Sequence, residues 1–373
     1  MSSSNNLLQH PTLGCKLRGK PSGTTIQYRG LKYASIPGRW NESTPVDSLV
    51  PDRNGVFNAT NFGPSCPHKR GAQAWDLTLV GNVNMDVEEG QGETEKMDEL
   101  ECLHVNVTTP QRREEEEKLL PVFVWVHGGG LSMGSNSWPQ YDLRRFVERS
   151  VESGKPIIGV SINYRVGILG FLASKELGVE GNLGFKDQVL AFKWVKRHIR
   201  GFGGDPANVT AAGESAGGIS LSTIMCADTG PGALFKRVIV MSGEATLRKP
   251  RNRRWHEELY ADQLKFLGLE KMGRAQRVRK LSEWDAEELC QKLPLAQHFC
   301  GLVDGKWLTK DVTLSVLADG QNEVHKPKWC KEFVIGDTAH DVRSLSTLSL
   351  SKCIFESNRE PTCALTSPFR EQY

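Results

Sequence analysis

Five short runs of consecutive apolar residues predict the strands of this chain. Apolar side chains follow one another in these runs without polar alternation. We therefore expect both faces of each strand to be buried, as in a parallel sheet that helices cover. The runs are residues 122–126, 157–162, 209–212, 238–241 and 333–335.

The segments between these runs predict helices. In residues 184–199 (GFKDQVLAFKWVKRHI), apolar side chains recur every three or four positions and share one helical face. After the fourth run, Tyr260, Leu264 and Leu267 repeat that spacing. Strands that alternate with helices predict the α/β class, with a mostly parallel central sheet and helices on both faces.

Two segments fall outside this rhythm. Residues 112–118 (RREEEEK) predict a solvated loop before the first strand of the list. After Val342 the alternation of strands and helices stops, and the last residues have neither period nor motif. We expect a domain over residues 1–342 and a disordered tail over residues 343–373.

Composition narrows the class of protein. The 373 residues are 38% hydrophobic and 24% charged, as in a globular domain. The net charge of +3 indicates no polyanionic partner, so we expect no binding of nucleic acid. One basic cluster has no accompanying aromatic ladder, and we predict it as a solvated loop. Its members are Arg248, Lys249, Arg251, Arg253 and Arg254.

Targeting and cysteine signals favour a cytoplasmic chain, with secretion the less expected alternative. No apolar run approaches the roughly 18 residues of a membrane span, and the N-terminus lacks a basic segment followed by an apolar one. The nine cysteines never form a C-x-x-C pair, which argues against a zinc site and against a disulfide framework. The oligomeric state has no signal in the sequence.

Residues 213–218 (GESAGG) match G-x-S-x-G, the strand-to-helix turn that exposes a nucleophilic serine. A predicted strand ends just before Ser215 and a predicted helix follows it. Small residues after Ser215 would let that helix pack against the strand. The backbone N–H of Ala216 would then face an oxygen that gains negative charge. A purely structural glycine turn is the alternative.

A glycine run follows the strand at 122–126, directly after His127. Glycine allows bare backbone to approach a tetrahedral intermediate, and HGGG loops supply N–H donors to an oxyanion hole. We predict Gly129 and Gly130 as donors together with Ala216, and Gly128 as the residue that shapes the loop. A flexible loop is the alternative, but the presence of the serine motif in the same chain favours the oxyanion hole.

These motifs resemble the type-B carboxylesterase/lipase family, the cholinesterase-like branch of the α/β-hydrolases. The resemblance implies the α/β-hydrolase fold, a small-molecule carboxylic ester as substrate, an acyl-enzyme on Ser215, and no cofactor or metal. Leu131 stands where the family usually has an aromatic residue. The stretches that carry the family resemblance are 181–218 (GNLGFKDQVLAFKWVKRHIRGFGGDPANVTAAGESAGG), 28–40 (YRGLKYASIPGRW), 101–107 (ECLHVNV) and 161–173 (SINYRVGILGFLA).

The resemblance also implies a cysteine pair and a catalytic acid. The family usually bridges the positions of Cys66 and Cys102, which we consider possible here only in an oxidising compartment. The family acid follows a later strand, and Asp341 occupies its position, with Val342 in place of the usual glycine. The alternative is that Asp341 is an ordinary loop carboxylate.

The family's third catalytic residue is a histidine beyond the acid. All nine histidines of this sequence lie at or before residue 340. His340 adjoins Asp341, and neighbours in an extended turn point apart. We therefore expect a hydrolase domain that lacks its last strands and helices, and a chain that is inactive or nearly inactive by itself.

Three functions are compatible with these motifs. The first is a carboxylic ester hydrolase with Ser215 as nucleophile and Asp341 as acid. The second is a non-catalytic binding or adhesion-type protein on the same scaffold. The retained serine and glycine loop argue against it, because a binding module needs neither. The third is a serine peptidase of the same fold, which shares every motif.

Overall fold

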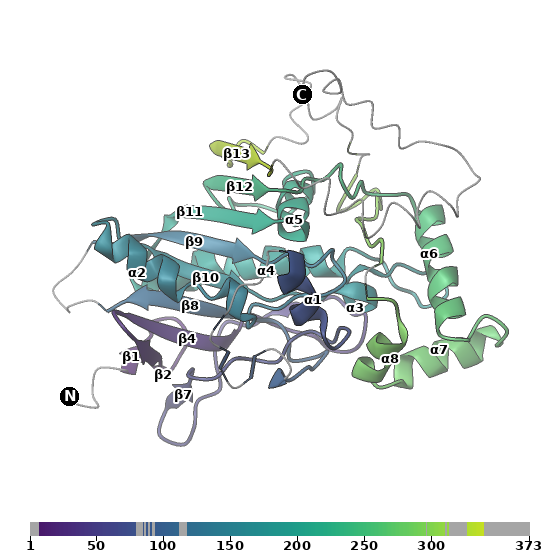
Figure 1. Cartoon of the computed structure of the whole chain (residues 1–373), viewed down its shortest axis with the longest axis horizontal. Coiled ribbons are helices and arrows are strands. Elements are labelled where there is room, and N and C mark those ends of the chain that lie inside the picture. Colours follow the sequence, from purple (N-terminus) through teal and green to yellow (C-terminus); the bar gives the residue numbers. More distant parts are fainter. Residues whose placement is uncertain are drawn as a thin grey trace. The chain divides into compact units, whose positions relative to one another are not determined.

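An eight-stranded sheet forms the centre of the computed structural model (Figure 1). The structure describes residues 7–79, 85, 87–88, 90–91, 94–111, 118–295, 297–309, 312 and 327–338. All elements lie in one unit, Met1–Gly336. In spatial order the strands of this sheet are β13 (Glu332–Gly336), β12 (Arg237–Met241), β11 (Gly204–Glu214), β9 (Leu120–Val126), β10 (Ile158–Ile162), β8 (His104–Pro110), β4 (Thr25–Lys32) and β3 (Lys20–Ser22).

The sheet changes character at β10. From β13 to β10 all neighbours are parallel, whereas β8, β4 and β3 join by antiparallel pairing. Two smaller sheets accompany it. They consist of β1 (Leu7–Gln9), β2 (Lys16–Arg18) and β7 (Val56–Asn58), and of β5 (Ala34–Ser35) with β6 (Thr44–Pro45).

Helices and 3-10 turns occupy the connections between strands. The helices are α1 (Ala72–Leu79), α2 (Arg144–Glu152), α3 (Gly167–Phe171), α4 (Leu183–His198), α5 (Ala216–Met225), α6 (Arg253–Phe266), α7 (Arg274–Glu283) and α8 (Ala286–Lys292). The 3-10 turns are η2 (Pro139–Tyr141) and η3 (Ile199–Phe202). Among the described residues, none of these helices has the length and apolar content that a membrane span requires.

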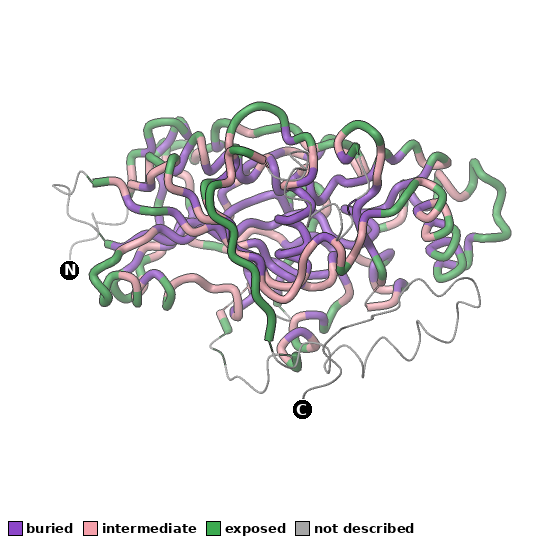
Figure 2. Tube along the Cα trace, turned by 90° about the horizontal axis from the view of Figure 1, so that it is seen from above, coloured by how far each residue is buried: buried purple, intermediate pink, exposed green. Residues whose placement is uncertain are grey.

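Helices pack on both faces of the parallel part. Gly159 in β10 lies against Leu143 and Val147 of the α2 region, while Gly213 in β11 lies against Gly217 of α5. The register pairs Gly159 with Phe123 and Gly213 with Val126 of β9. Since these two β9 positions differ by an odd number, they point to opposite faces. Because helices cover the sheet, most of the buried residues belong to the interior of the unit. Figure 2 shows these residues, in purple, concentrated in its middle.

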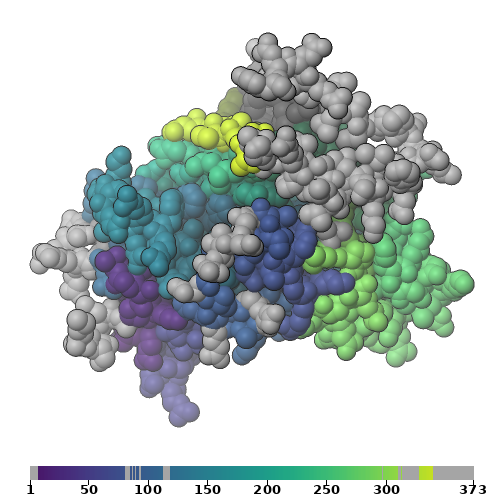
Figure 3. All heavy atoms as spheres, in the orientation of Figure 1, coloured from purple at the N-terminus to yellow at the C-terminus, as the bar shows by residue number. Residues whose placement is uncertain are grey.

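The predicted fold class is confirmed. The five apolar runs fall in β9, β10, β11, β12 and β13, and the two predicted helices are α4 and α6. The expectation that all five strands are buried on both faces is met only in part by β9 and β12, each of which has one half-buried face, and it is wrong for residues 333–335. Phe333, Val334 and Ile335 are 48%, 55% and 57% exposed, because β13 is the edge strand of the described sheet. Figure 3 shows atoms of this strand, in yellow, at the molecular surface.

The basic cluster around residue 250 is not the solvated loop that we predicted. Arg253 and Arg254 begin α6, which Asn252 caps by accepting the Trp255 backbone N–H. Arg248 turns inward and is only half-exposed. Sequence patterns place charged side chains outside by default, and only the tertiary fold determines which of them turns in. The acidic loop at 112–117 and the tail at 343–373 lie outside the described residues.

Candidate active site

The strand-to-helix turn at Ser215 holds the serine in a strained backbone conformation. Its φ of 52° and ψ of −119° lie where side-chain-bearing residues rarely sit, at a cost of roughly 1–3 kcal/mol. Hydrogen bonds fix both sides of the turn: the Ser215 N–H donates to Met241 O at 2.9 Å, and Ile219 N–H donates to Ser215 O at 2.9 Å. A strain that the surroundings hold in this way is typical of a functional residue.

Small residues let α5 pack against β11, the strand named in the prediction, and also bring it into contact with the end of β9. A Cβ on Gly217 would collide with Val126 O and lie 3.1 Å from His127 O. Only glycine permits this approach. Ala216 is the first residue of α5, so its N–H has no acceptor within the helix and remains available to an anion.

The glycine loop lies directly beside the serine. A Cβ on Gly128 would be 3.4 Å from Ser215 Cβ and 2.9 Å from a carboxylate oxygen of Glu214. This proximity follows from the parallel pairing of β9 with β11, because parallel neighbours end at the same edge of a sheet. The structure thus brings Gly128, Ser215 and Ala216 together.

Backbone hydrogen bonds close the glycine loop into a turn. Gly129 has φ of 99°, and its carbonyl accepts from Ser132 N–H at 3.0 Å and from Met133 N–H at 3.1 Å. Leu131, which follows Gly130, is fully buried, and its carbonyl accepts from Gly167 N–H at 2.7 Å. The loop is therefore ordered by its own backbone and by the start of α3.

His127 supports the loop and does not reach the serine. Its ring stacks on Tyr164 with centroids 4.3 Å apart, and its Nδ1 donates to Gly128 O at 2.9 Å. Burial lowers the pKa of His127 to about 4, so the ring is neutral near pH 7. A neutral imidazole held in this way serves as packing.

No histidine within the described ranges forms a hydrogen bond with Ser215. Each is instead occupied with packing or with bonds elsewhere in the fold. They are His10, His68, His104, His127, His198, His256 and His298. The predicted acid Asp341, together with His325 and His340, lies outside the described residues. Within the described ranges, no group of three or more His, Cys, Asp or Glu side chains could hold a metal ion.

A buried polar cluster that the sequence does not predict lies beneath the glycine loop. Glu95 is 6% exposed and accepts from Ser65 Oγ at 2.6 Å and from Trp138 Nε1 at 3.2 Å, while His68 Nε2 lies 3.3 Å from its other oxygen. Burial alone would raise the pKa of Glu95, but these partners, His68 first, lower it. The cluster ties residues 65–95 to the segment after the glycine loop. No residue spacing indicated it.

Cys66 and Cys102 lie near this cluster in the sequence, directly after Ser65 and a few residues after Glu95. Both are fully buried free thiols. Burial raises the pKa of the Cys102 thiol, and the neighbouring Cys66 raises it further. A bridge between them remains an expectation for oxidising conditions.

Acidification from pH 7 to 5 should destabilise the fold. Burial lowers the pKa of His104, His127 and His256 from 6.5 to about 4. Between these values the unfolded chain binds more protons than the folded chain. The free energy of unfolding should therefore fall by about 1.4 kcal/mol per pH unit for each histidine. Urea denaturation at several pH values measures the slope.

The matched variant for this prediction is His256→Gln, which should make the slope shallower by one proton. The ion pairs of Glu88 do not contribute to this slope. Hydrogen bonds from Arg29, opposed by partial burial, hold the pKa of Glu88 at about 2, so the stability that its ion pairs contribute is lost only below about pH 4.5. An unfolding free energy that stays constant from pH 7 to 5 would contradict the prediction.

Comparisons with known proteins agree with this geometry. Residues 9–352 match the model of the carboxylesterase family. Lipase 3 of Yarrowia lipolytica is 36% identical over 270 residues, which cover 70% of this chain and 51% of that protein. An inactive carboxylesterase-like protein, VdtD of Byssochlamys spectabilis, is 33% identical over 59% of this chain and 35% of its own length.

The fold agrees with solved structures as well. A thermophilic PNB esterase superposes with a TM-score of 0.69 at 27% identity, over 90% of this chain and 64% of that one. The chain spans about half the length of Lipase 3 and about a third of VdtD. The residues that match the family model, 9–352, include both the serine turn and the glycine loop.

Proposed function

This chain belongs to the carboxylesterase family, and on that premise we propose that it carries the nucleophile and oxyanion hole of a carboxylic ester hydrolase. One observation supports this most directly. Ser215 is held at positive φ between β11 and α5, with Gly128 packed against its Cβ. A turn that only needed to change direction would place glycine there, since glycine adopts positive φ without strain.

In this proposal the Ser215 Oγ attacks the carbonyl carbon of the ester. The new C–O bond forms while the carbonyl electron pair moves onto oxygen. The resulting oxyanion accepts hydrogen bonds from the N–H groups of Gly129, Gly130 and Ala216. Collapse of this intermediate expels the alcohol and leaves an acyl group on Ser215, which water then removes.

Proton transfer requires a base that the described residues do not place at Ser215. We propose Asp341 as the acid that orients this base. A histidine normally takes the serine proton and returns it to the leaving alcohol. In this proposal, residues 127–225 supply the nucleophile and the groups that stabilise the oxyanion.

A second candidate is a non-catalytic protein on the same scaffold. The inactive relative VdtD favours it, since membership of the family does not guarantee turnover. A peptidase of the same fold is the third candidate, and only substrates separate it from an esterase. The retained strain at Ser215 supports the hydrolase over the binding protein.

Labelling with an alkyl fluorophosphonate tests the proposal. The reagent should attach slowly to Ser215 in residues 1–373, over a long incubation, because its phosphoryl oxygen occupies the oxyanion position but no described residue activates the serine. Peptide mass spectrometry locates the adduct. Ser215→Ala should reduce labelling to background, whereas Ser222→Ala, on the same helix, should not change it. Absence of an adduct at Ser215 in folded protein would favour the non-catalytic candidate. Paired ester and amide substrates then distinguish esterase from peptidase.

A further inference from the structure

The glycine loop has no side chains of its own at residues 128–130, yet an arginine from elsewhere fills the space beside it. A Cβ on Gly130 would lie 3.3 Å from Nη2 of Arg248 and 3.9 Å from its Cζ. The guanidinium group therefore packs directly against the Gly130 α-carbon. It takes the place that a side chain of the loop would occupy.

The guanidinium group is itself held in place. Its Nη1 donates to Gln297 O at 2.7 Å and to Phe299 O at 3.3 Å. Hydrogen bonds to a charged donor are stronger than neutral ones and more directional. Two carbonyl acceptors on one nitrogen fix the plane of the group, so its position relative to Gly130 is determined by the segment 297–299.

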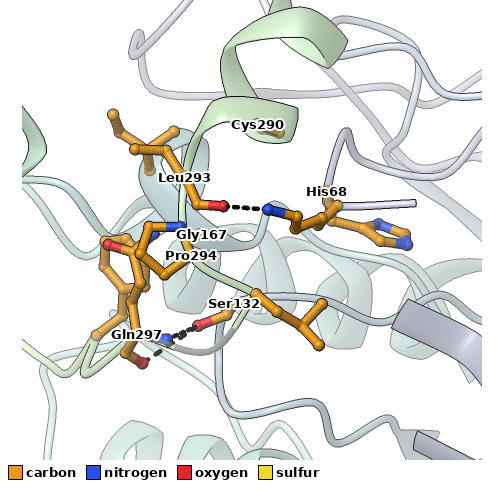
Figure 4. Close-up of a pocket in the computed structure, with 11 residues that line it drawn as sticks. His68, Ser132, Gly167, Cys290, Leu293, Pro294 and Gln297 are labelled. Atoms are coloured by element: carbon orange, nitrogen blue, oxygen red, sulfur yellow. Dashed lines mark hydrogen bonds between the residues drawn. The ribbon is translucent and has the colours of Figure 1, made fainter. Parts of the chain in front are cut away.

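Ser132 joins that same segment to the glycine loop. Its Oγ donates to Gln297 O and accepts from Gln297 N–H, both at 3.2 Å (Figure 4). These residues form one wall of a pocket of about 20 Å³, room for roughly one water. Arg248 and Ser132 thus converge on the same carbonyl, that of Gln297. The segment 297–299 is held to the loop at two points.

The segment that leads to Arg248 begins next to Ser215. The chain leaves β12 at Met241, whose carbonyl accepts the Ser215 N–H. It then passes Gly243, where a Cβ would collide with Ser215 O. Five residues later it presents Arg248 to Gly130. The segment 241–248 therefore connects the back of the serine turn to the far end of the glycine loop.

We propose that Arg248 is a positioning residue that braces the oxyanion loop against the serine turn. The inference rests on the proposed function in one respect: the loop matters for rate only if Ser215 reacts. Glycines at 128–130 allow close approach but leave the loop backbone easily deformed. An oxyanion hole stabilises charge only when its donors are held in place beforehand. Arg248 supplies that rigidity from outside the loop.

The bracing is tested by hydrogen exchange at two amides. The N–H groups of Ser132 and Met133 donate to Gly129 O, so their protection reports the closed loop. In Arg248→Met these two amides should exchange about tenfold faster, a change of the size expected for losing charge-assisted hydrogen bonds. Arg248→Lys keeps the charge but not the two-acceptor geometry and should fall between. Arg251→Met, an exposed neighbouring cation, is the matched control and should leave both amides unchanged.

The consequence for reactivity is measured on the same proteins. The rate of Ser215 phosphonylation at saturating reagent should fall about tenfold in Arg248→Met, with the half-saturating concentration within threefold of wild type. If Arg248 only stabilised the fold, folded Arg248→Met would react at the wild-type rate. There would then be no lost rate for Arg248→Lys to restore in part. Ser132→Ala should lower the rate in the same direction. Combined with Arg248→Met, it should cost less than the two single effects multiplied, because both side chains hold segment 297–299.

The results of these measurements support or overturn the bracing role of Arg248. Unchanged exchange at Ser132 and Met133 in folded Arg248→Met would overturn the bracing, as would faster exchange with an unchanged phosphonylation rate. If Arg248→Met does not fold, Arg248→Lys and Ser132→Ala provide the same two measurements. If wild type shows no adduct at Ser215, the proposed function fails, while the exchange data still decide whether Arg248 holds the loop.

Discussion

A polypeptide of residues 1–373 should turn over p-nitrophenyl esters about 10⁶-fold more slowly than a hydrolase with a complete triad. Without a base, Ser215 must lose its proton to water. No histidine in the described part of the chain bonds to Ser215, and the sequence has none after His340. The oxyanion hole alone should retain roughly 10³–10⁴-fold acceleration over water.

Initial rates per folded molecule, measured at several substrate concentrations, test this expectation. Ser215→Ala on the same polypeptide separates slow serine chemistry from background hydrolysis. Ordinary enzyme rates from residues 1–373 would show that a base is present after all. His325 and His340, which lie outside the described residues, would then be replaced in turn by Gln to find it.

Gly217→Ala should lower the free energy of unfolding by about 2 kcal/mol. Alanine normally favours a helix over glycine by about 1 kcal/mol. Here the added Cβ collides with Val126 O, and overpacking of this kind costs about 1–3 kcal/mol, occasionally more. We expect the collision to dominate, because a backbone carbonyl in a central strand cannot move alone. Denaturant unfolding provides the measurement.

The same substitution should slow Ser215 phosphonylation by about 100-fold, since the clash separates α5 from the end of β9. Displacements near 1 Å have effects of that size. Gly336→Ala is the control, because a Cβ there meets nothing within 4 Å, and its stability should change by less than about 0.5 kcal/mol. Gly217→Ala protein that is as stable and as reactive as wild type would disprove the close packing.

The fold was predictable from sequence wherever burial leaves an uninterrupted apolar run. β10 is the best case, since every one of its residues is buried. β13 also contains an apolar run but lies exposed at the edge, because an apolar run indicates a strand and not its number of neighbours. Strand order, which decides that number, is a property of crossover connections that local pattern does not encode.

The candidate site likewise contains some residues that the sequence predicts and others that it does not. Ser215 and the glycines at 128–130 were predictable because their chemistry demands those residue types in a fixed local order. Arg248 was not, since its role depends on the carbonyls of Gln297 and Phe299, about fifty residues away. Glu95 was missed for the same reason. Asp341 remains a prediction, because it lies outside the described residues.

The position of β13 also has a consequence for the order of folding. β12 ends at Met241 and β13 begins at Glu332, so α6, α7 and α8 must all be accommodated in the crossover between two adjacent strands. Closing so long a loop costs entropy, and contacts between residues so distant in sequence form slowly. The docking of β13 should therefore be a late step of folding, like the pairing of β4 with β8, whose residues are also far apart along the chain. Until β13 docks, β12 carries the open edge, and the lifetime of that intermediate determines how readily newly made chains associate with one another.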